Sequence, residues 1–411
     1  MLHQETRALI IGGGFGGIQT ALNLEAQHIP NLKITLVSNK SHFEYLPTLY
    51  RVITGKSPLE VCIPIRDIFE EKRIEFCLDT IISFDPEKRR AHGESGSTYQ
   101  FDYAILALGS ETAYFNIPGL SKHSFTFKSV REAIILKNHL HTLFEECKAT
   151  SDPARKVSAL HFVIVGGGPT GIELAGELSE YARALCTNHG ISRDLLTIDI
   201  LEGASRILPM FPKETSEIVK KRLHELQINV FTNRPMVKEE LDTLEARGVS
   251  MNTQTVIWTA GVKPHSFYGT IKGFVFDQKG RVLVNEYLEA QGNNNIFVIG
   301  DGASTPFSGM AQTAVHDGNF VASVIGDKLK RIPILHYKPK KPYYSLPIGS
   351  GWAITSIGPF TLTGYKGWIV RRLADLRYFI SILSFKKAFT VFQNGKILCE
   401  TCEICNESIG V

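Results

Sequence analysis

Two glycine-rich segments of this chain have the spacing that lets a backbone turn approach a phosphate group closely. They are Gly12-Gly13-Gly14-Phe15-Gly16-Gly17 and Gly166-Gly167-Gly168-Pro169-Thr170-Gly171. In a G-x-G-x-x-G pattern the first glycine allows a tight turn, the second admits a pyrophosphate to the backbone, and the third permits close helix packing. A helix that begins there offers free amides and the positive end of its dipole. Two such segments predict that electrons pass between two dinucleotides, because a purely structural glycine turn would have to occur twice.

The flanking residues have the periodicity of the strands and helices needed to hold these glycines. The same elements (strand, helix, strand and closing strand) are expected twice, at residues 8–11, 17–26, 33–37 and 102–108, and again at 161–165, 173–185, 197–201 and 255–258. The two closing strands end at Gly109 and Gly261. A last strand, 296–299, leads to Asp301 and to a helix at 310–325. This pattern predicts an α/β fold with two Rossmann-like dinucleotide-binding domains.

The positive charge of the chain is concentrated late in the sequence. The 411 residues carry a formal net charge of +4 and 43% apolar residues, which is ordinary for a globular protein. Between residues 328 and 387 almost every charged side chain is Lys or Arg, with Asp375 as the exception. We expect this segment to meet an anionic membrane surface, and we expect no nucleic-acid partner.

Residues 366–391 combine this charge with an apolar stripe typical of an amphipathic helix. The stripe repeats at spacings of three and four and consists of Ile369, Leu373, Leu376, Ile380 and Leu383. Arg371 and Asp375 fall on the opposite side. A basic amphipathic helix predicts attachment to the membrane from one side, within a C-terminal α+β region at 331–411. The alternative is a helix used for core packing or for a homodimer contact.

The remaining sequence signals bear on location and on cysteine chemistry. The first expected strand begins by Arg7, which leaves no room for a signal peptide, and no apolar run approaches the roughly 20 residues that span a bilayer. We therefore expect a cytoplasmic protein, peripheral on the inner face of the cell membrane. Cys399, Cys402 and Cys405 could hold a metal only with a fourth ligand, and none stands nearby, so we expect reduced thiols and no metal site.

Several of these segments together resemble type II NADH:quinone oxidoreductases, a family of flavoproteins with two dinucleotide-binding domains. The resemblance covers nearly the whole chain. It rests on the two glycine segments and on the motifs Tyr45-Leu46-Pro47-Thr48-Leu49-Tyr50, Trp258-Thr259-Ala260-Gly261, Val298-Ile299-Gly300-Asp301 and Ala311-Gln312-Thr313-Ala314-Val315-His316. It implies that the first glycine segment holds FAD, that the second holds NADH as co-substrate, and that the acceptor is a quinone.

The resemblance also implies which side chains serve the site. The cofactor-binding residues would be Gly12, Gly14, Phe15, Gly16, Gly17, Ser38, Asn39, Pro47, Ile81, Gly109, Gly166, Gly168, Pro169, Thr170, Gly171, Glu202, Gly261, Asp301, Ala311 and Gln312. Asp301 would bind the ribityl chain of FAD, and Ile81 falls where the backbone meets the adenine. The catalytic residues would be Glu173, Gln312 and His316, with Glu173 beside the nicotinamide and flavin rings.

Three positions decide how closely the resemblance applies. Ser38 stands where relatives usually have an acid for the adenosine ribose, so FAD binding should depend more on Asp301. Glu202 ends the second strand of the other half and favours NADH over NADPH, although Arg206 could weaken that preference. His316 replaces the glutamine usual in the family; an imidazole could donate a proton to the acceptor, or it could be a structural histidine bonded to a carbonyl.

These expectations assign residues 1–115 and 265–330 to a discontinuous FAD-binding domain and residues 116–264 to an NADH-binding domain. The expected activity is hydride transfer from NADH to FAD followed by transfer of two electrons to a membrane quinone. Two alternatives stay open. One is an NAD(P)H-flavin reductase with a non-quinone acceptor, and the other is a flavin-bound redox sensor or scaffold that resembles apoptosis-inducing-factor relatives.

Overall fold

A five-stranded parallel sheet organises the first part of the chain in the computed structural model, which describes residues 5–396. Its strand order is β20-β9-β1-β2-β5, so the strand before the first glycine segment lies at the centre. The strands are β1 (Thr6–Ile11), β2 (Leu32–Ser38), β5 (Ile74–Leu78), β9 (Tyr103–Leu106) and β20 (Ile296–Val298). The last strand comes from far along the chain and pairs in parallel with β9.

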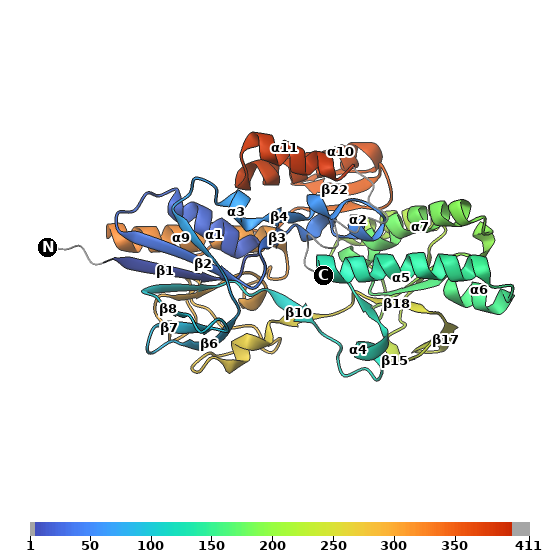
Figure 1. Ribbon diagram of the computed structural model, residues 1–411, viewed down its shortest axis with the longest axis horizontal. Helices are drawn as coiled ribbons and strands as arrows, with labels where there is room; N and C mark the ends of the chain where they lie inside the picture. The colour runs from blue at the N-terminus through green and yellow to red at the C-terminus, as the bar shows by residue number, and fades with distance from the viewer. Residues whose placement is uncertain (1–4, 397–411) are drawn as a thin grey trace.

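A second parallel sheet repeats this arrangement. Its order, β11-β18-β12-β13-β14, again places the strand before the glycines in the middle, next to the closing strand. The strands are β11 (Phe125–Thr126), β12 (His161–Val165), β13 (Thr197–Leu201), β14 (Asn229–Phe231) and β18 (Thr255–Trp258). The predicted α/β fold with two Rossmann-like units is therefore confirmed (Figure 1).

Long helices cover the two sheets. Against the first sheet, α1 (Phe15–Glu25) packs closely on α9 (Ala311–Lys330). In the second half the helices are α5 (Val130–Ala149), α6 (Pro153–Ala159), α7 (Pro169–His189) and α8 (Lys213–Glu225), with the short helix α4 (Leu120–His123) beside the strands. Both α1 and α7 begin inside a glycine segment, at Phe15 and Pro169, a few residues before the starts predicted at 17 and 173. Each glycine turn ends a strand and leaves the residues after its third glycine free to become helical.

Each half also carries a small antiparallel sheet on its outside, and a further two-stranded sheet connects the two halves. The outer ribbons are β6 (Ile81–Asp85), β7 (Arg90–Gly93) and β8 (Thr98–Gln100), and β15 (Met236–Glu240), β16 (Thr243–Ala246) and β17 (Val249–Asn252). The joining ribbon consists of β10 (Ser110–Thr112) and β19 (Val262–Pro264), which pair antiparallel. Both passages of the chain between the two parallel sheets therefore run side by side.

The segment after β2 forms a bridge between the two halves. It contains β3 (His42–Glu44), the short helix α2 (Tyr50–Ile53), β4 (Cys62–Pro64) and α3 (Ile65–Ile68), with 3-10 turns at Leu46–Thr48 and Pro58–Glu60. Helix α2 packs on α5 and α7, while β3 pairs with β4 beside the first sheet. Its buried residues Val52 and Ile53 belong to the core of the second half.

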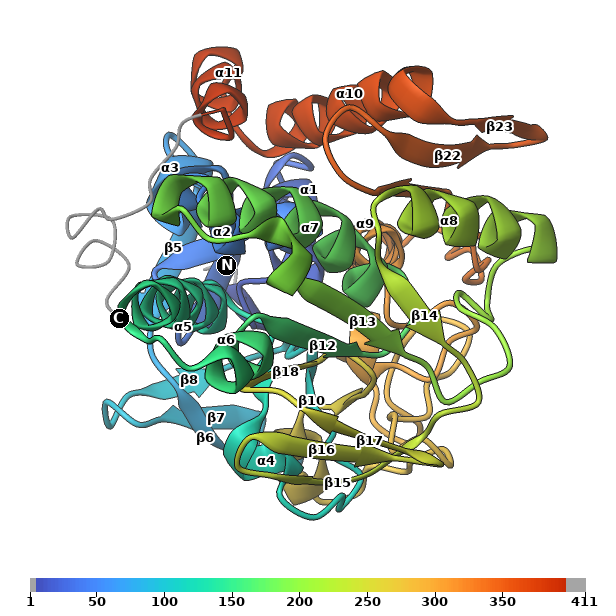
Figure 2. The same ribbon diagram turned by 90° about the vertical axis from the view of Figure 1, so that its right-hand side faces the viewer.

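The C-terminal region lies along one edge of the molecule as a small sheet and two helices (Figures 1 and 2). These are β21 (Tyr344–Pro347), β22 (Ala353–Ile357), β23 (Phe360–Leu362), α10 (Gly364–Ile382) and α11 (Phe385–Asn394). The prediction of one helix over 366–391 is wrong, because the backbone is extended at Leu383 and Ser384. Leu383, expected on the exposed stripe, turns into the core of the first half. Within residues 5–396, no helix combines the length and the apolar character needed to cross a bilayer.

Candidate functional site

The first glycine segment forms a tight turn with open space above it. Gly12 has a φ of +113°, and a Cβ there would lie 2.3 Å from the Ala107 carbonyl oxygen. A Cβ on Gly17 would lie 1.9 Å from the carbonyl oxygen of Gly12, so helix and strand meet too closely for any side chain. Above Gly14 no atom would lie within 4 Å of a Cβ. This cradle of bare backbone at the start of α1 fits a pyrophosphate.

The second glycine segment repeats the same turn. Gly166 has a φ of +118°, and a Cβ on Gly171 would lie 2.1 Å from the Gly166 carbonyl oxygen. Gly168 again has nothing within 4 Å of its Cβ position. Pro169 occupies the first position of α7, where its missing N–H leaves no hydrogen bond unmade, and Thr170 is exposed in the first turn. The residues present therefore fit a dinucleotide in each half.

The two cradles differ at the end of the second strand. In the second half, Glu202 accepts hydrogen bonds from the Gly167 amide (2.8 Å, Oε2) and the Ala204 amide (2.7 Å, Oε1). In the first half Ser38 takes the same place, since a Cβ on Gly13 would lie 2.8 Å from Ser38 Oγ. The predicted contrast between an acidic and a neutral strand end is therefore present in the geometry.

Arg206 is engaged by its own loop and by the first turn of α8. Its guanidinium donates to the carbonyl oxygens of Leu208, Pro209 and Phe211 and to the Ser216 hydroxyl, at 2.6–2.9 Å. These bonds hold the guanidinium on the loop that follows Glu202. The sequence suggested that Arg206 could weaken the preference for NADH, but in this geometry it has no free donor pair for a 2′-phosphate.

Asn39 and Ile81 flank a polar cavity beyond Ser38. The cavity has a volume of about 320 Å³ and is lined by Asn39, Leu78, Asp79, Thr80, Glu94 and Ser95. Asn39 is exposed there. Ile81 begins β6 next to Thr80, but its side chain is buried in a core with Leu9 and Val37. Only the backbone of Ile81 could therefore face an adenine at this position.

Asp301 takes part in a chain of polar contacts that the sequence did not reveal. The hydroxyl of Ser110, on β10, donates to Asp301 Oδ2, and Lys128 Nζ donates to the same hydroxyl. Burial lowers the pKa of Lys128, while the charge of Asp301 opposes that shift. Gly109, with a φ of +71°, leaves open space beside this chain. Asp301, Gly109 and Lys128 thus converge at the joining ribbon, although they are far apart in sequence.

Gln312 and His316 lie on one side of α9 as predicted, but both bind backbone. Gln312 makes two hydrogen bonds with Tyr343, from Nε2 to the carbonyl oxygen (2.8 Å) and from the Tyr343 amide to Oε1 (3.1 Å). His316 Nε2 lies 2.9 Å from the Lys338 carbonyl oxygen. Of the two roles considered for His316, this geometry favours the structural one, a histidine bonded to a carbonyl. Ala311, at the start of the helix, is partly exposed.

Asp317 is a buried acid on α9 that the sequence did not single out. It is fully buried, accepts from the Gly300 amide at 3.0 Å and accepts from the Tyr337 hydroxyl. Since Gly300 precedes Asp301, this contact fixes the position of the Asp301 backbone. The role of Asp317 could not be predicted from sequence, because a single acid directly after His316 matches no motif.

Glu173 lies one turn into α7, close to the bridge segment and to α10. Burial raises its pKa to about 8, and the nearby charge of Arg371 on α10 works in the opposite direction. Arg371 is itself buried and donates through Nη2 to the Pro47 carbonyl oxygen at 2.8 Å. Glu173, Pro47 and Arg371 therefore bring the second half, the bridge segment and the C-terminal region to one place. Gly261 lies apart from them, under the ring of Phe115.

Comparison with known proteins places this arrangement among flavoenzymes. Residues 6–318 match the family model of the pyridine nucleotide-disulphide oxidoreductases, which is most of the chain. The chain belongs to this family. It is 26% identical to the type II NADH:quinone oxidoreductase Ndh of Mycobacterium tuberculosis, over 95% of this chain and 89% of that protein. It is also 26% identical to the type II NADH:quinone oxidoreductase of Staphylococcus epidermidis, over 94% of this chain and 99% of that protein.

Solved structures give the same fold at lower identity. NDH2 of Plasmodium falciparum in complex with NADH superposes with a TM-score of 0.84 at 19% identity, over 96% of this chain and 98% of that one. The sulfide:quinone oxidoreductase of Aquifex aeolicus superposes with a TM-score of 0.77 at 18% identity, over 95% and 92% of the two chains. The protein is thus a flavoprotein oxidoreductase of the pyridine nucleotide-disulphide family, with the fold of NDH2.

The inner side of α10 in this oxidoreductase is held to the bridge segment by a buried network of ion pairs. Arg371 binds Asp375 (2.5 Å), and Arg372 binds both Asp375 (3.1 Å) and Glu60 (2.7 Å). Arg51 pairs with the other oxygen of Glu60, which is fully buried. The sequence placed Arg371 and Asp375 opposite the apolar stripe, and the structure adds that this side faces the protein.

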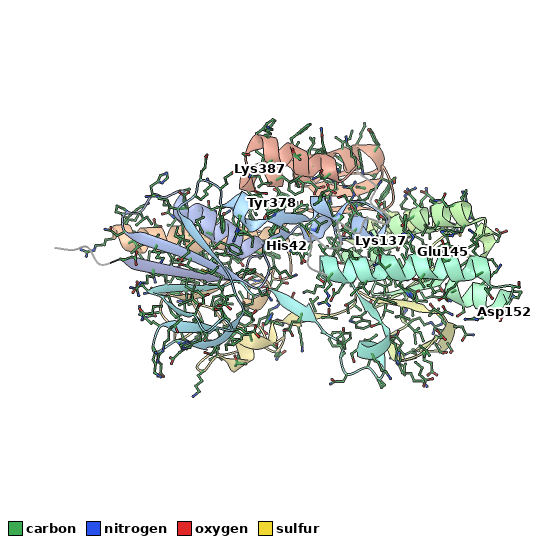
Figure 3. The ribbon with its side chains drawn as sticks, viewed as in Figure 1. His42, Lys137, Glu145, Asp152, Tyr378 and Lys387 are labelled. Carbon is green, nitrogen blue, oxygen red and sulfur yellow. The ribbon has the colours of Figure 1, made fainter. Side chains whose placement is uncertain are left out.

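Aromatic rings continue the same contact toward the first cradle. Tyr378 of α10 lies between that helix and the strands below it (Figure 3), 5.2 Å from the ring centre of Phe15 and 5.3 Å from that of Tyr45. Tyr45 also donates its hydroxyl to Asp375 at 2.7 Å. Because Phe15 belongs to the first glycine segment, α10 packs directly onto the residues that shape the cradle.

The outer side of α10 and α11 in this oxidoreductase is apolar, basic and exposed. We call it the apolar face; its large side chains are Tyr365, Ile369, Leu373, Ile380, Phe385 and Phe389. Leu373 is 58% and Phe385 is 71% exposed. The exposed cations Lys366, Arg377 and Lys386 lie among them. Exposed apolar side chains with cations between them in the sequence are typical of a surface that binds a membrane or another protein.

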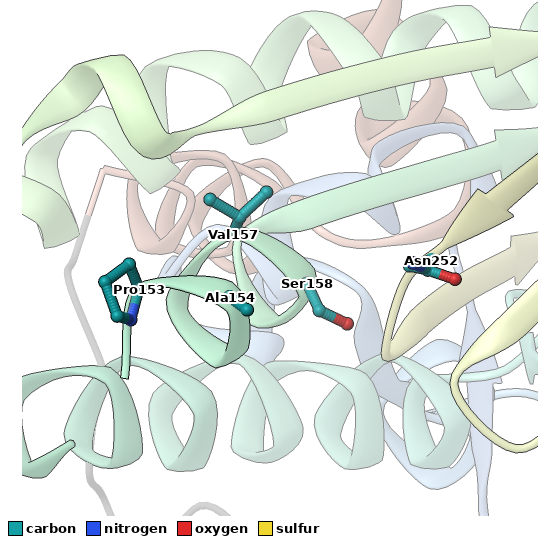
Figure 4. A pocket seen from close by; sticks show the side chains of 5 residues that line it. All are labelled: Pro153, Ala154, Val157, Ser158 and Asn252. Atoms are coloured by element: carbon teal, nitrogen blue, oxygen red, sulfur yellow. The ribbon is translucent and has the colours of Figure 1, made fainter. Parts of the chain in front are cut away.

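A further cavity lies away from both cradles. It measures about 380 Å³ and is lined by Pro153, Ala154, Val157, Ser158 and Asn252, around α6 (Figure 4). None of the predicted site residues lines it. No cluster of three or more His, Cys, Asp or Glu suited to a metal occurs in residues 5–396. Cys399, Cys402 and Cys405 lie outside the described residues.

Proposed function

We propose that this oxidoreductase transfers hydride from NADH to FAD and then passes two electrons to a quinone at a membrane surface. The observation that carries this proposal is the position of the apolar face. The inner side of the same helix, α10, contacts Pro47 through Arg371 and contacts Phe15, in the first cradle, through Tyr378. A lipid-soluble acceptor could reach the site from there without crossing water. Both curated relatives described above are named as type II NADH:quinone oxidoreductases.

The two cradles divide the cofactors between them. FAD is held by the first glycine segment and by Asp301, within residues 1–115 and 265–330, and NADH by the second segment, within residues 116–264. The flavin supplies the redox chemistry when bound, since it accepts a hydride and releases electrons to an acceptor. The chain's own residues bind, orient and provide protons.

NADH is the expected donor because of Glu202. A carboxylate at this strand end accepts from the 2′-hydroxyl of an adenosine ribose and repels a 2′-phosphate. Its two backbone hydrogen bonds hold it beside Gly167 of the cradle. Arg206, bound to three carbonyl oxygens of its own loop and to the Ser216 hydroxyl on α8, does not compensate for that repulsion.

Glu173 is the residue we assign to proton transfer in this site. Its raised pKa, about 8, keeps a proton on the carboxyl group at neutral pH. Reduction of a quinone needs protons as well as electrons, and a protonated carboxyl group beside the bound acceptor would supply one. Gln312 and His316 act as positioning residues that hold the segment containing Lys338 and Tyr343 against α9.

The apolar face supports attachment of the protein to the membrane as a peripheral protein, on the side where NADH is available. Apolar side chains would enter the lipid interface while Lys366, Arg377 and Lys386 meet anionic headgroups. A homodimer built on the same face is the competing use of these residues. Sedimentation of the protein with anionic vesicles, against its oligomeric state in their absence, separates the two.

The decisive experiment is an anaerobic titration of the bound flavin with NADH and with NADPH, followed by a short-chain quinone in the presence of lipid. Rapid bleaching by NADH and reoxidation by quinone supports the proposal. A second candidate, a flavin reductase with a non-quinone acceptor, is favoured by the engagement of Gln312 and His316 with backbone. Rapid bleaching without reoxidation by quinone would support that candidate, and slow bleaching would support a redox sensor.

A further inference from the structure

One ammonium group reaches from the second half of the molecule to the candidate flavin site of the first half. Lys128 lies between β11, a strand of the second sheet, and the start of α5. Its Nζ donates to the Ser110 hydroxyl, and that hydroxyl donates to Asp301 Oδ2. Ser110 belongs to the joining ribbon, and Asp301 follows β20 of the first sheet. The three side chains therefore connect the two halves through one chain of hydrogen bonds.

The backbone at Lys128 is held in place by two acids. Glu132 Oε2 accepts from the amides of Lys128 (2.6 Å) and Ser129 (3.1 Å), and the Ser129 hydroxyl accepts in return from the Glu132 amide (3.2 Å). Glu44, on β3 of the bridge segment, accepts from the Val130 amide at 3.3 Å. The side chain of the lysine therefore starts from a fixed point at the beginning of α5.

The ammonium group has Ser110 as its one hydrogen-bond partner within residues 5–396. Burial lowers the pKa of this lysine, and three nearby acids favour its charged form; they are Asp301, Glu132 and Glu111. Glu132 is used by the backbone at the start of α5, and Glu111 accepts from the Ser266 hydroxyl at 2.7 Å. The charge of the lysine is therefore directed along the chain to Asp301.

An ammonium group fixes the direction of both hydrogen bonds in this chain. It has three donors and no acceptor, so the Ser110 oxygen must accept from it and the Ser110 proton is left for Asp301. Asp301 Oδ2 is thereby engaged, while its Oδ1 accepts no hydrogen bond within residues 5–396. Asp317 holds the backbone just before it through the Gly300 amide, at 3.0 Å. A carboxylate oxygen fixed in this way suits a ligand group that donates, such as a hydroxyl group of a sugar alcohol.

The chain of hydrogen bonds ends beside the first cradle. A Cβ on Gly16 would lie 2.8 Å from the side chain of Ile299, two residues before Asp301. Gly109, which precedes Ser110, has no atom within 4 Å of its Cβ position and so leaves room for a ligand. In FAD the ribityl chain carries hydroxyl groups and joins the pyrophosphate to the flavin ring. A ribityl hydroxyl group is therefore the donor that this position fits.

We propose that Lys128 is a positioning residue for FAD, which acts through Ser110 to hold Asp301 as the acceptor of a ribityl hydroxyl group. This inference rests on the proposed function, since it takes FAD as the ligand of the first cradle. The cofactor of the first half is then bound with the help of a residue from the second half. Because the carboxylate is oriented before FAD binds, less ordering remains to oppose binding. Retention of FAD therefore depends on how the two halves are placed.

The test measures release of FAD from the holoenzyme on dilution, followed by the rise in flavin fluorescence, with no nicotinamide or quinone present. Lys128→Met should release FAD roughly ten- to a hundredfold faster, the range expected for losing one charge-assisted hydrogen bond. Lys128→Arg keeps a charged donor and should restore most of the retention. Lys122→Met, which changes an exposed lysine on α4 of the same half, should match the wild type.

A double-variant cycle tests whether Lys128 acts through Ser110. Ser110→Ala should weaken retention about as much as Lys128→Met, and the double variant should lose little more, because both changes interrupt one chain. An FAD analogue whose side chain at N10 carries no hydroxyl groups should bind equally well to the wild type and to Lys128→Met. A lysine with a purely structural role would instead affect FAD and the analogue alike.

Retention of FAD by Lys128→Met at the wild-type rate would overturn the proposal. Losses that multiply in the double variant, or an equal loss of FAD and of the analogue, would also contradict it, since either result makes the lysine independent of Asp301. Ser110→Ala gives the same comparison with the analogue if Lys128→Met does not fold. Failure of the FAD-loaded wild type to reduce quinone would instead overturn the proposed acceptor and leave these measurements intact, because release of FAD needs no acceptor.

Discussion

Replacing Glu202 by Gln should change the choice of nicotinamide cofactor. In the structure the carboxylate lies against the Gly167 amide at the end of β13, where the adenosine ribose of a dinucleotide would meet it. A unit charge about 4 Å from another in a medium of effective dielectric constant about 20 contributes about 4 kcal/mol. Partial exposure and salt reduce this to about 2–3 kcal/mol, so the preference for NADH over NADPH should fall roughly 30- to 150-fold.

The assay is kcat/KM for bleaching of the flavin by each nucleotide, measured at one ionic strength and again at higher salt. Glutamine can still accept a hydrogen bond, so most of the change should come from better use of NADPH. Arg206→Ala is the matched control. It removes three hydrogen bonds within the loop and one to Ser216 on α8, and it should weaken the binding of both nucleotides alike. An unchanged NADH-to-NADPH ratio in Glu202→Gln, or loss of NADPH use alone in Arg206→Ala, would refute this account of the specificity.

Three further predictions concern stability and membrane binding. Glu60→Gln removes the buried negative charge that Arg51 and Arg372 share, which should cost about 3–5 kcal/mol and lower the melting temperature by about 5 °C in a chain of this size. In His161, burial disfavours the charged form, but the hydrogen bonds to Asp199 and to the Asn252 carbonyl outweigh it, so the folded-state pKa is raised. His161→Gln should therefore cost about 2 kcal/mol below about pH 6.5, and less as pH rises through the folded-state pKa. Leu373→Glu on the apolar face should weaken binding to anionic vesicles about tenfold or more, because it places a charge in the lipid interface.

Each of these predictions has a control and a contrary outcome. Glu87→Gln alters an exposed acid and should leave the melting temperature unchanged; equal effects of the two glutamate variants would contradict the role of the buried network. For His161, a difference in melting temperature that does not depend on pH would show that the ion pair with Asp199 contributes nothing. For the apolar face, Val237→Glu on β15 is the control, since Val237 is similarly exposed but far from α10. Loss of vesicle binding in both variants would point to net charge rather than to this face.

The two cradles could be predicted from sequence because their geometry depends on local rules. A glycine is needed at residues 12 and 166, where φ is positive. It is also needed at residues 17 and 171, where a Cβ would overlap a backbone carbonyl oxygen. The strand and helix on either side follow from periodicity. Glu202 was found for the same reason, since an acid at the end of the second strand has a fixed place relative to the glycines.

Contacts between distant segments could not be predicted in this way. Lys128, Ser110 and Asp301 come together only because β10 passes between the two sheets. The break in the C-terminal helix could not be predicted either, since no proline or glycine marks it. The extended residue Leu383 is fixed by burial in the core of the first half, a tertiary effect that overrides helix periodicity.

The pairing of β10 with β19 also bears on how such a chain could have arisen and how it could be rebuilt. Because Thr112 lies opposite Val262, everything between them leaves and re-enters the rest of the molecule at neighbouring points. A gene fragment encoding that stretch could be exchanged for its counterpart from another member of the family without moving either junction. The nucleotide preference set by Glu202 would then be transferred with the fragment, whereas the bridge segment and α10 would remain with the recipient, so that Glu173 of the new fragment would have to fit Pro47 and Arg371 of the old chain.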